Sequence, residues 1–214
     1  LATDRAVMLR RSYRGIGKRG IGVGYPQGVN LAFDAEQMRL ATLWKGEFAD
    51  PGAVWRGQGS GTVRPLSREV IQLAKGPELD DRQSPWIIDD GRPPERQFRG
   101  YFLDELDRPT FMYRFEHVNV EDYPVDYIDD RGEPVLKRTL TFKAAKPRDG
   151  AVFRVAEDDS ISPGDGDWYR VGERLKIRIP DDRGELIETH NGKQLVVPID
   201  VPTGKSQLVI LYAW

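Results

Sequence analysis

Short apolar runs separated by turn residues constrain the fold of this chain more than any other feature of its sequence. In the second half of the chain the runs recur roughly every eight to twelve residues, and no amphipathic segment of helix length lies between them. The 22 glycines and 15 prolines are scattered between the runs rather than gathered in one linker, which is typical of a chain with many turns. The pattern predicts an all-β protein built as an antiparallel β-sandwich.

The second half of the chain supplies most of the predicted strands. Asn191 and Gly192 favour a tight hairpin between two of them, because this pair adopts positive φ angles at low cost. The last run, 207–212, is apolar enough to lie inside a sheet rather than at its edge. Strands are expected over residues 98–103, 110–117, 118–127, 135–142, 152–156, 168–171, 175–179, 186–189, 194–197 and 207–212.

The first half is less regular. Residues 28–34 and 38–44 alternate in polarity and predict a hairpin, and 70–73 predicts a short strand. Two long stretches, 50–61 and 75–94, lack periodicity and are expected to be irregular loops, each of which carries a tryptophan. We expect an N-terminal arm over 1–20, either a short helix or extended chain, followed by a single β-sandwich domain over 21–214.

The spacing Gly15-x-Gly17-x-x-Gly20 matches a dinucleotide-binding turn, in which a helix begins at the third glycine. Here that glycine is followed by Gly22, Gly24 and a proline, which disfavour a helix. We therefore expect extended chain over 21–25, with apolar side chains on one face and glycines on the other.

Composition excludes several classes of function. The 32 basic and 34 acidic side chains nearly balance, so no overall field attracts nucleic acid, and no nucleic-acid partner is predicted. The absence of cysteine excludes disulfides, cysteine-type zinc sites and covalent haem attachment, and no cofactor is predicted. No apolar run approaches the ~20 residues that span a bilayer. The sequence begins at Leu1, which indicates a processed mature chain or part of a longer one.

Catalytic and metal-binding patterns are sparse. The chain has two histidines, His117 and His190, and Ser60 lies outside the GxSxG pattern of a nucleophile elbow. A hydrolase or isomerase that acts on sugars through His117 and carboxylates would need a cleft that gathers these groups. The acidic passage 157–167 carries five carboxylates but does not match an EF-hand, so a calcium loop and a solvated turn both remain open.

Three stretches carry a resemblance to a known family: IGVGYPQGVNLAFDAEQMRLATLWKGEFADPGAVWRGQG (21–59), FRGYFLDELDRPTFMYRF (98–115) and LKRTLTF (136–142). They resemble the β-rich C-terminal region of large bacterial periplasmic haem-binding proteins, where it follows c-type cytochrome modules and often sugar-dehydrogenase-like propellers. The resemblance implies a periplasmic location beside a c-type cytochrome or another redox partner. The haem-binding residues of the family cannot be carried over, because this chain lacks the CxxCH motif.

Two functions follow as expectations. The first is a non-catalytic extrinsic subunit or module, peripheral to the membrane, that docks on a membrane-associated redox or electron-transfer complex and stabilises it. Its predicted partner-binding residues are Trp55, Trp86, Arg10, Arg11 and Arg14. The alternative is a carbohydrate-binding β-sandwich module, which exposed tryptophans would favour and buried ones would contradict. Its candidate aromatic residues are Trp55, Trp86, Tyr101 and Trp168.

Overall fold

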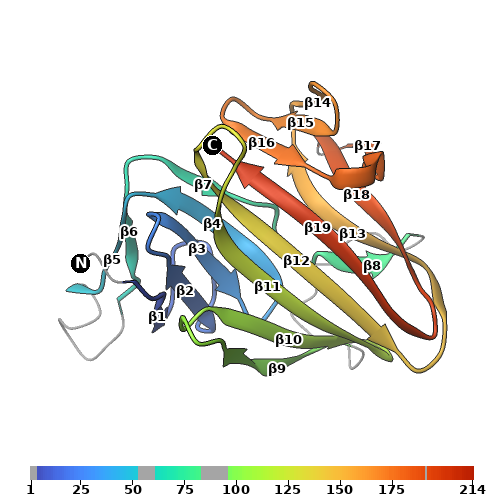
Figure 1. Cartoon of the computed structure of the whole chain (residues 1–214), viewed down its shortest axis with the longest axis horizontal. Coiled ribbons are helices and arrows are strands. Elements are labelled where there is room, and N and C mark those ends of the chain that lie inside the picture. Colours follow the sequence, from blue (N-terminus) through green and yellow to red (C-terminus); the bar gives the residue numbers. More distant parts are fainter. Residues whose placement is uncertain (1–3, 53–60, 83–95, 191) are drawn as a thin grey trace.

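The computed structural model describes residues 4–52, 61–82, 96–190 and 192–214. Nearly every element in these ranges is a β-strand, and a 3-10 turn lies at Pro180–Asp182. No helix of these ranges has the length and apolar character needed to cross a bilayer. The prediction of an all-β antiparallel fold is confirmed (Figure 1).

An eight-stranded antiparallel sheet forms the continuous layer of the sandwich (Figure 1). Along each of its strands, alternate side chains enter the core and the others face outward, so the sheet has one buried face and one open face. In spatial order its strands are β14 (Ile161–Pro163), β15 (Trp168–Val171), β16 (Leu175–Arg178), β19 (Gly204–Ala213), β12 (Pro134–Ala144), β11 (Val118–Ile128), β10 (Pro109–Phe115) and β9 (Arg96–Leu103).

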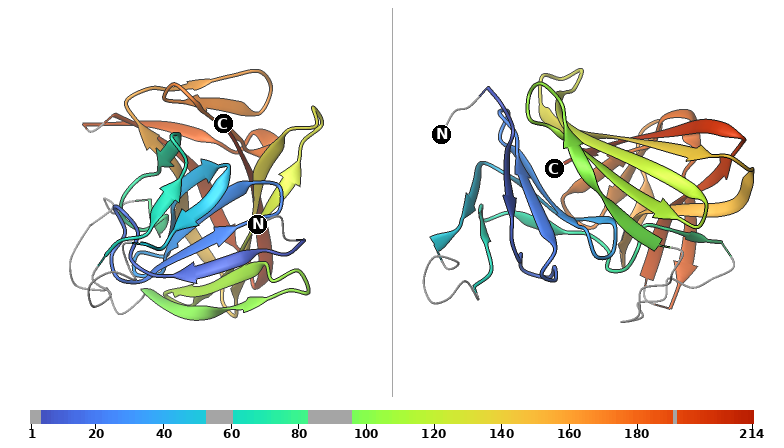
Figure 2. Two further views of the ribbon diagram at one scale, coloured as in Figure 1. Left: turned by 90° about the vertical axis from the view of Figure 1, so that its left-hand side faces the viewer. Right: turned by 90° about the horizontal axis from the view of Figure 1, so that it is seen from below.

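Two smaller sheets cover the buried face of the large one, and their separate positions are visible in Figure 2. Phe33 of the first stacks on Phe111 of β10 at 4.1 Å between ring centroids, and Phe153 of the second meets Phe142 of β12 edge-on at 6.4 Å. One continuous core results. The first sheet has the order β1 (Val7–Arg10), β2 (Gly20–Gly24), β3 (Val29–Asp34), β4 (Arg39–Lys45), β7 (Val70–Gln72), and the second β17 (Glu185–Thr189), β18 (Gly192–Val201), β13 (Arg148–Asp158), β8 (Leu79–Asp81).

The other face of the five-stranded sheet is covered by a second, smaller core around Tyr13 and Trp44. Strands β5 (Glu47–Asp50) and β6 (Arg64–Leu66) pair beside it. The glycine-rich segment is strand β2, as expected, and its glycines face this core: a Cβ on Gly22 would lie 1.9 Å from the Tyr13 hydroxyl oxygen. Of the three glycines in the GxGxxG spacing, Gly20 also lies against this ring, since a Cβ there would be 2.9 Å from Tyr13 Cδ2, whereas Gly15 and Gly17 are close to Gln72 and Glu36.

Most predicted strands are present, and several short ones were not foreseen. The hairpin β3–β4 and the pairing of β17 with β18 are confirmed, although Asn191 itself lies outside the described residues. β19 pairs with β12 and β16, so the last strand is interior as predicted. The N-terminal arm contributes β1, and β8 lies within the stretch predicted to be irregular.

The acidic passage 157–167, for which a calcium loop and a solvated turn were both open, contains strand residues. Its first residues complete β13, and Ile161–Pro163 form β14. The reason is the buried side chain of Ile161, which pairs with Val171 on β15 and anchors the passage to the large sheet.

Candidate functional site

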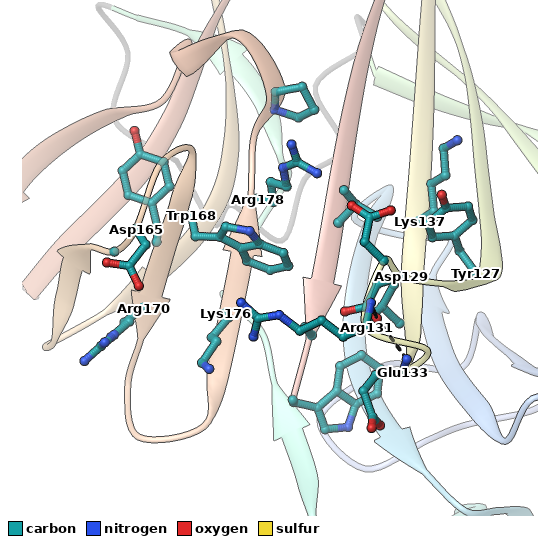
Figure 3. A pocket seen from close by; sticks show the side chains of 18 of the residues that line it. Tyr127, Asp129, Arg131, Glu133, Lys137, Asp165, Trp168, Arg170, Lys176 and Arg178 are labelled. Carbon is teal, nitrogen blue, oxygen red and sulfur yellow. Dashed lines mark hydrogen bonds between the residues drawn. The ribbon is translucent and has the colours of Figure 1, made fainter.

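A groove of about 750 Å³ lies on the open face of the eight-stranded sheet, near the C-terminal end of β19 (Figure 3). Its floor is formed by outward-facing residues of β19, and its sides come from β15–β16 and from β11–β12. Trp168 and Arg178 lie on one side of β19, and Tyr127 and Lys137 lie on the other (Figure 3).

The strand register determines which side chains meet in the groove. The intervening residues Tyr169, Ile177 and Tyr212 are buried in the core, so their neighbours along each strand face outward. Outward-facing residues at matching positions form rows across the sheet: Trp168, Arg178, Leu211 and Lys137 in one row, and Arg170, Lys176 and Ala213 in the next.

Aromatic side chains line both sides of this floor. Trp168 is half-buried, and Tyr127 is 41% exposed. At the end of β19, Trp214 is half-buried, with the Lys45 ammonium 5.2 Å from its ring centroid. Lys137 sits 5.1 Å from the centroid of Tyr127 in the same way. The groove thus presents flat apolar surfaces with cations beside them.

The turn between β11 and β12 forms a preorganised rim. The Asp129 carboxylate accepts hydrogen bonds from the backbone N–H groups of Arg131 (2.9 Å) and Glu133 (2.8 Å). These bonds, first the one from Glu133, lower the pKa of Asp129 below its ordinary value. Gly132 completes the turn with a φ of +82°. From this turn, Arg131 extends across the groove toward the side that carries Lys176 (Figure 3).

Positive charge predominates in the groove. Seven cationic and four acidic side chains line it, although the whole chain has a net charge of −2. Arg178 is held by Asp167, whose carboxylate oxygens lie 2.8 and 2.9 Å from Nε, and this hydrogen bonding raises the pKa of Arg178. Burial lowers the pKa of Lys45, and Glu133 and Asp129 partly offset that effect.

Five of the seven lining cations form no ion pair with any described residue. The acceptors within 4.0 Å of Arg174 and Arg178 are Glu69 and Asp167, respectively. In the described part of the chain no carboxylate lies within 4.0 Å of the other five lining cations, which are Lys45, Arg131, Lys137, Arg170 and Lys176. Among the described residues, the lining of the groove contains no histidine, serine, threonine or cysteine.

The structure places the predicted site residues in different regions. Trp168 lines the groove, whereas Tyr101 packs half-buried against Phe111 at the other end of the large sheet. The predicted partner-binding residues Arg10, Arg11 and Arg14 are exposed, and none of them lines the groove. Trp55 and Trp86 lie outside the described residues.

The catalytic and metal alternatives find no matching arrangement in the described ranges. His117 is an exposed turn residue 4.0 Å from Glu116 and does not line the groove. No group of three or more His, Asp or Glu side chains among the described residues could hold a metal ion. Two carboxylates of the acidic passage have other partners, Glu157 with Arg154 at 2.6 Å and Asp167 with Arg178.

A buried ionic cluster in the core was also not predicted from the sequence. Arg138 donates to both oxygens of Asp122 (2.9 and 2.6 Å) and to both oxygens of Glu78 (2.8 and 2.5 Å). Burial opposes the charge on Arg138, but the two carboxylates outweigh it and raise its pKa well above the ordinary value. Burial also raises the pKa of Glu78, against the effect of Arg138. All three side chains are buried in the core, so the cluster is structural.

Sequence reasoning found Trp168 but missed the cations around it. The available signal was alternation: in 168–171 and 175–178, every second residue is apolar and buried, and the residues between them are Trp168, Arg170, Lys176 and Arg178. Only the pairings of β15 with β16, of β16 with β19 and of β19 with β12 show that these residues share one face with Lys137.

Comparison with known proteins adds no relatives. A scan against models of protein families finds none that matches this chain, and a search of curated proteins also returns no match.

Proposed function

We propose that this chain is a non-catalytic carbohydrate-binding β-sandwich module and that the groove beside β19 is its ligand site. The observation that carries the proposal is the half-buried indole of Trp168, which lies in an open groove among polar and charged side chains. Tyr127 lies on the other side of β19 (Figure 3).

The chemistry of the groove matches the surface of a sugar. A pyranose ring has an apolar face of C–H groups that packs on an aromatic ring, and its hydroxyl groups at the ring edge need hydrogen-bond partners. Trp168 offers the aromatic face, while Arg178 and Asp165 offer polar groups near it. Arg178 is already positioned by Asp167, so little side-chain entropy is lost when a ligand binds.

Affinity electrophoresis through gels that contain soluble polysaccharides tests this function. We expect at least one polysaccharide to retard the wild-type chain, and Trp168→Ala to abolish the retardation. Phe102→Ala is the matched control, because Phe102 is a 49% exposed aromatic residue on β9, outside the groove. Retardation that survives in Trp168→Ala, or none with any neutral or acidic polymer, would contradict the proposal.

A second candidate function is that of an extrinsic periplasmic module that docks on a membrane-associated redox complex and contacts a c-type cytochrome there. It is supported by the resemblance of residues 21–59, 98–115 and 136–142 to a region of periplasmic haem-binding proteins. An exposed apolar group at the β9–β10 turn also favours it: Phe102, Leu103 and Leu106 are 49, 44 and 41% exposed. The Arg10 guanidinium lies 5.8 Å from the Tyr101 ring on the same strand β9, close to this group.

Purification of the chain from its own membranes in mild detergent tests the second candidate. We expect a haem-containing complex to co-purify in a fixed ratio with the wild type and to be lost with Phe102→Asp. Leu186→Asp serves as the control, since Leu186 is a 37% exposed residue on β17 in a different sheet. Recovery of the wild-type chain without haem proteins would rule this function out.

A further inference from the structure

We propose that the groove selects acidic saccharides, polymers whose sugar units carry carboxylate or sulfate groups. This inference rests on the proposed carbohydrate-binding function and narrows its ligand class. It is carried by the arrangement of the basic side chains on β15, β16 and β12.

Two cations face each other directly across the β15–β16 pair. Arg170 and Lys176 are register partners on the outward face of the sheet, and both are exposed. Like charges at directly opposite positions destabilise a sheet. An anion bound between the two side chains would remove this repulsion, so the pair is better suited to a liganded state than to an empty groove.

The surrounding residues leave these cations available. Neither Arg170 nor Lys176 has a carboxylate within 4.0 Å among the described residues, and the same holds for Lys137 on the other side of β19. Four acidic residues of the described chain also line the groove, Asp129, Asp130, Glu133 and Asp165, but none of them lies within 4.0 Å of Arg170, Lys176 or Lys137. Negative charge from outside the chain is therefore the complement that the floor of the groove lacks.

The same arrangement disfavours neutral saccharides. A neutral ring seated on Trp168 would displace water from Arg170 and Lys176 without supplying a counter-charge, and partial desolvation of an unpaired cation is costly. The cations thus lower the affinity of the groove for a neutral saccharide and raise its affinity for an acidic one.

Aromatic surface distinguishes an acidic saccharide from other polyanions. Trp168 and Tyr127 lie within the field of the same cations, on the two sides of the floor (Figure 3). A polymer with charges but no ring, such as polyglutamate, can pair with the cations but cannot pack on the indole. A saccharide that carries both a ring face and a carboxylate uses both features.

Polygalacturonate and its methyl ester provide a matched pair of probes, because they share one backbone and differ in charge. We expect polygalacturonate, alginate or chondroitin sulfate to bind at least about tenfold more tightly than methyl-esterified polygalacturonate or dextran. Binding of the acidic polymer should weaken about tenfold between about 50 and about 200 mM salt, as expected for a polyanion that meets two or three cations. Polyglutamate should bind weakly.

The variant Arg170→Gln/Lys176→Gln should lose about tenfold in affinity for the acidic polymer while its unfolding midpoint does not fall. The matched control is Lys143→Gln/Lys205→Gln. These two lysines are also register partners on the outward face of the same sheet, but they lie outside the groove, and Lys143 is paired with Glu121. The control should bind as the wild type does.

The outcomes separate this inference from the proposed function. Equal binding of the methyl ester and the acid, abolished by Trp168→Ala, would overturn acid selectivity and leave the carbohydrate module intact. If polyglutamate binds as tightly as polygalacturonate and Trp168→Ala does not weaken this binding, both the acid selectivity and the carbohydrate-binding function are overturned. The groove would then be a general anion-binding surface. Absence of binding to every polymer would also overturn both.

Discussion

The guanidinium of Arg138 is satisfied by two carboxylates in the middle of the core. Asp122 on β11 is its neighbour on the large sheet, and Glu78 precedes β8 on the opposing layer, so one side chain links two layers. Neither the pairing nor the burial is visible in the sequence, because Asp122 and Glu78 lie 16 and 60 positions away from Arg138. In the sequence, each of the three residues resembles an ordinary surface charge. A pattern of local alternation indicates the face of a strand but not the partner across the core.

Replacement of Arg138 tests this cluster. Arg138→Met leaves two buried carboxylates without a counter-charge, so we expect it to lower the free energy of unfolding by about 3 to 5 kcal/mol. Lys143→Met, which removes an exposed ion pair with Glu121, should cost less than about 1 kcal/mol. Urea unfolding monitored by tryptophan fluorescence measures both variants. A loss for Arg138→Met as small as that of the control would contradict the structural role of the cluster.

At the scale of single elements, strand β2 shows why glycines recur in a strand. The ring of Tyr13 lies across Gly22, and the Cβ of any other residue there would lie 1.9 Å from the hydroxyl oxygen and 2.4 Å from Cζ. The alternation of apolar residues with glycines was enough to predict the extended conformation of this segment. It could not predict Tyr13 as the covering side chain, because that contact depends on the return of the arm over the sheet.

We expect Gly22→Ala to lower the free energy of unfolding by about 1 to 3 kcal/mol, because the added methyl group displaces a buried ring. Gly17→Ala is the control, since its Cβ would meet only the end of the flexible Glu36 side chain. In a double-mutant cycle with Tyr13→Leu, the cost of Gly22→Ala should shrink. Strictly additive costs would show that Tyr13 is not the obstacle.

Short edge elements account for most of the strands that were not predicted. β1 has four residues and β8 has three, and each pairs with one neighbour in its sheet. A run of three or four residues is too short to show alternation, so such strands are defined by their partners rather than by their own pattern. Long interior strands such as β12 and β19 combine both signals, and their central parts were predicted, over 135–142 and 207–212.

At the scale of the whole molecule, the groove has no local signature. Its lining runs from Lys45 to Trp214 and combines residues of β4, the β11–β12 turn, β15–β16 and β19. Sequence reasoning therefore predicted the all-β sandwich and one aromatic residue of the site. The positive charge of the groove appears only when the register aligns strands that are far apart in the chain.

The buried tyrosines predict how the stability of the molecule depends on pH. Burial raises the pKa of Tyr13, Tyr25, Tyr113 and Tyr212, and burial together with a hydrogen bond to Asp104 raises that of Tyr123 to about 12. The folded chain holds these protons more tightly than the unfolded chain does. The protonated tyrosines therefore contribute fully to the free energy of unfolding below pH 10, the ordinary pKa of tyrosine, and this contribution is lost as the pH rises above 10.

We therefore expect the free energy of unfolding to be lower at about pH 11 than at about pH 9, by up to about 1.4 kcal/mol per pH unit for each fully buried tyrosine. Urea unfolding at the two pH values measures this difference. The near-ultraviolet absorbance of tyrosinate should also rise at higher pH in the folded chain than in the unfolded chain. Coincident titrations of the two states would contradict the burial of these phenols.

A crystal structure of the chain with a short oligogalacturonate tests the central claim most directly. The account predicts a sugar ring packed on Trp168, with carboxylates between Arg170 and Lys176 and toward Lys137. A saccharide bound elsewhere on the molecule, or a groove that stays empty at saturating ligand, would contradict it.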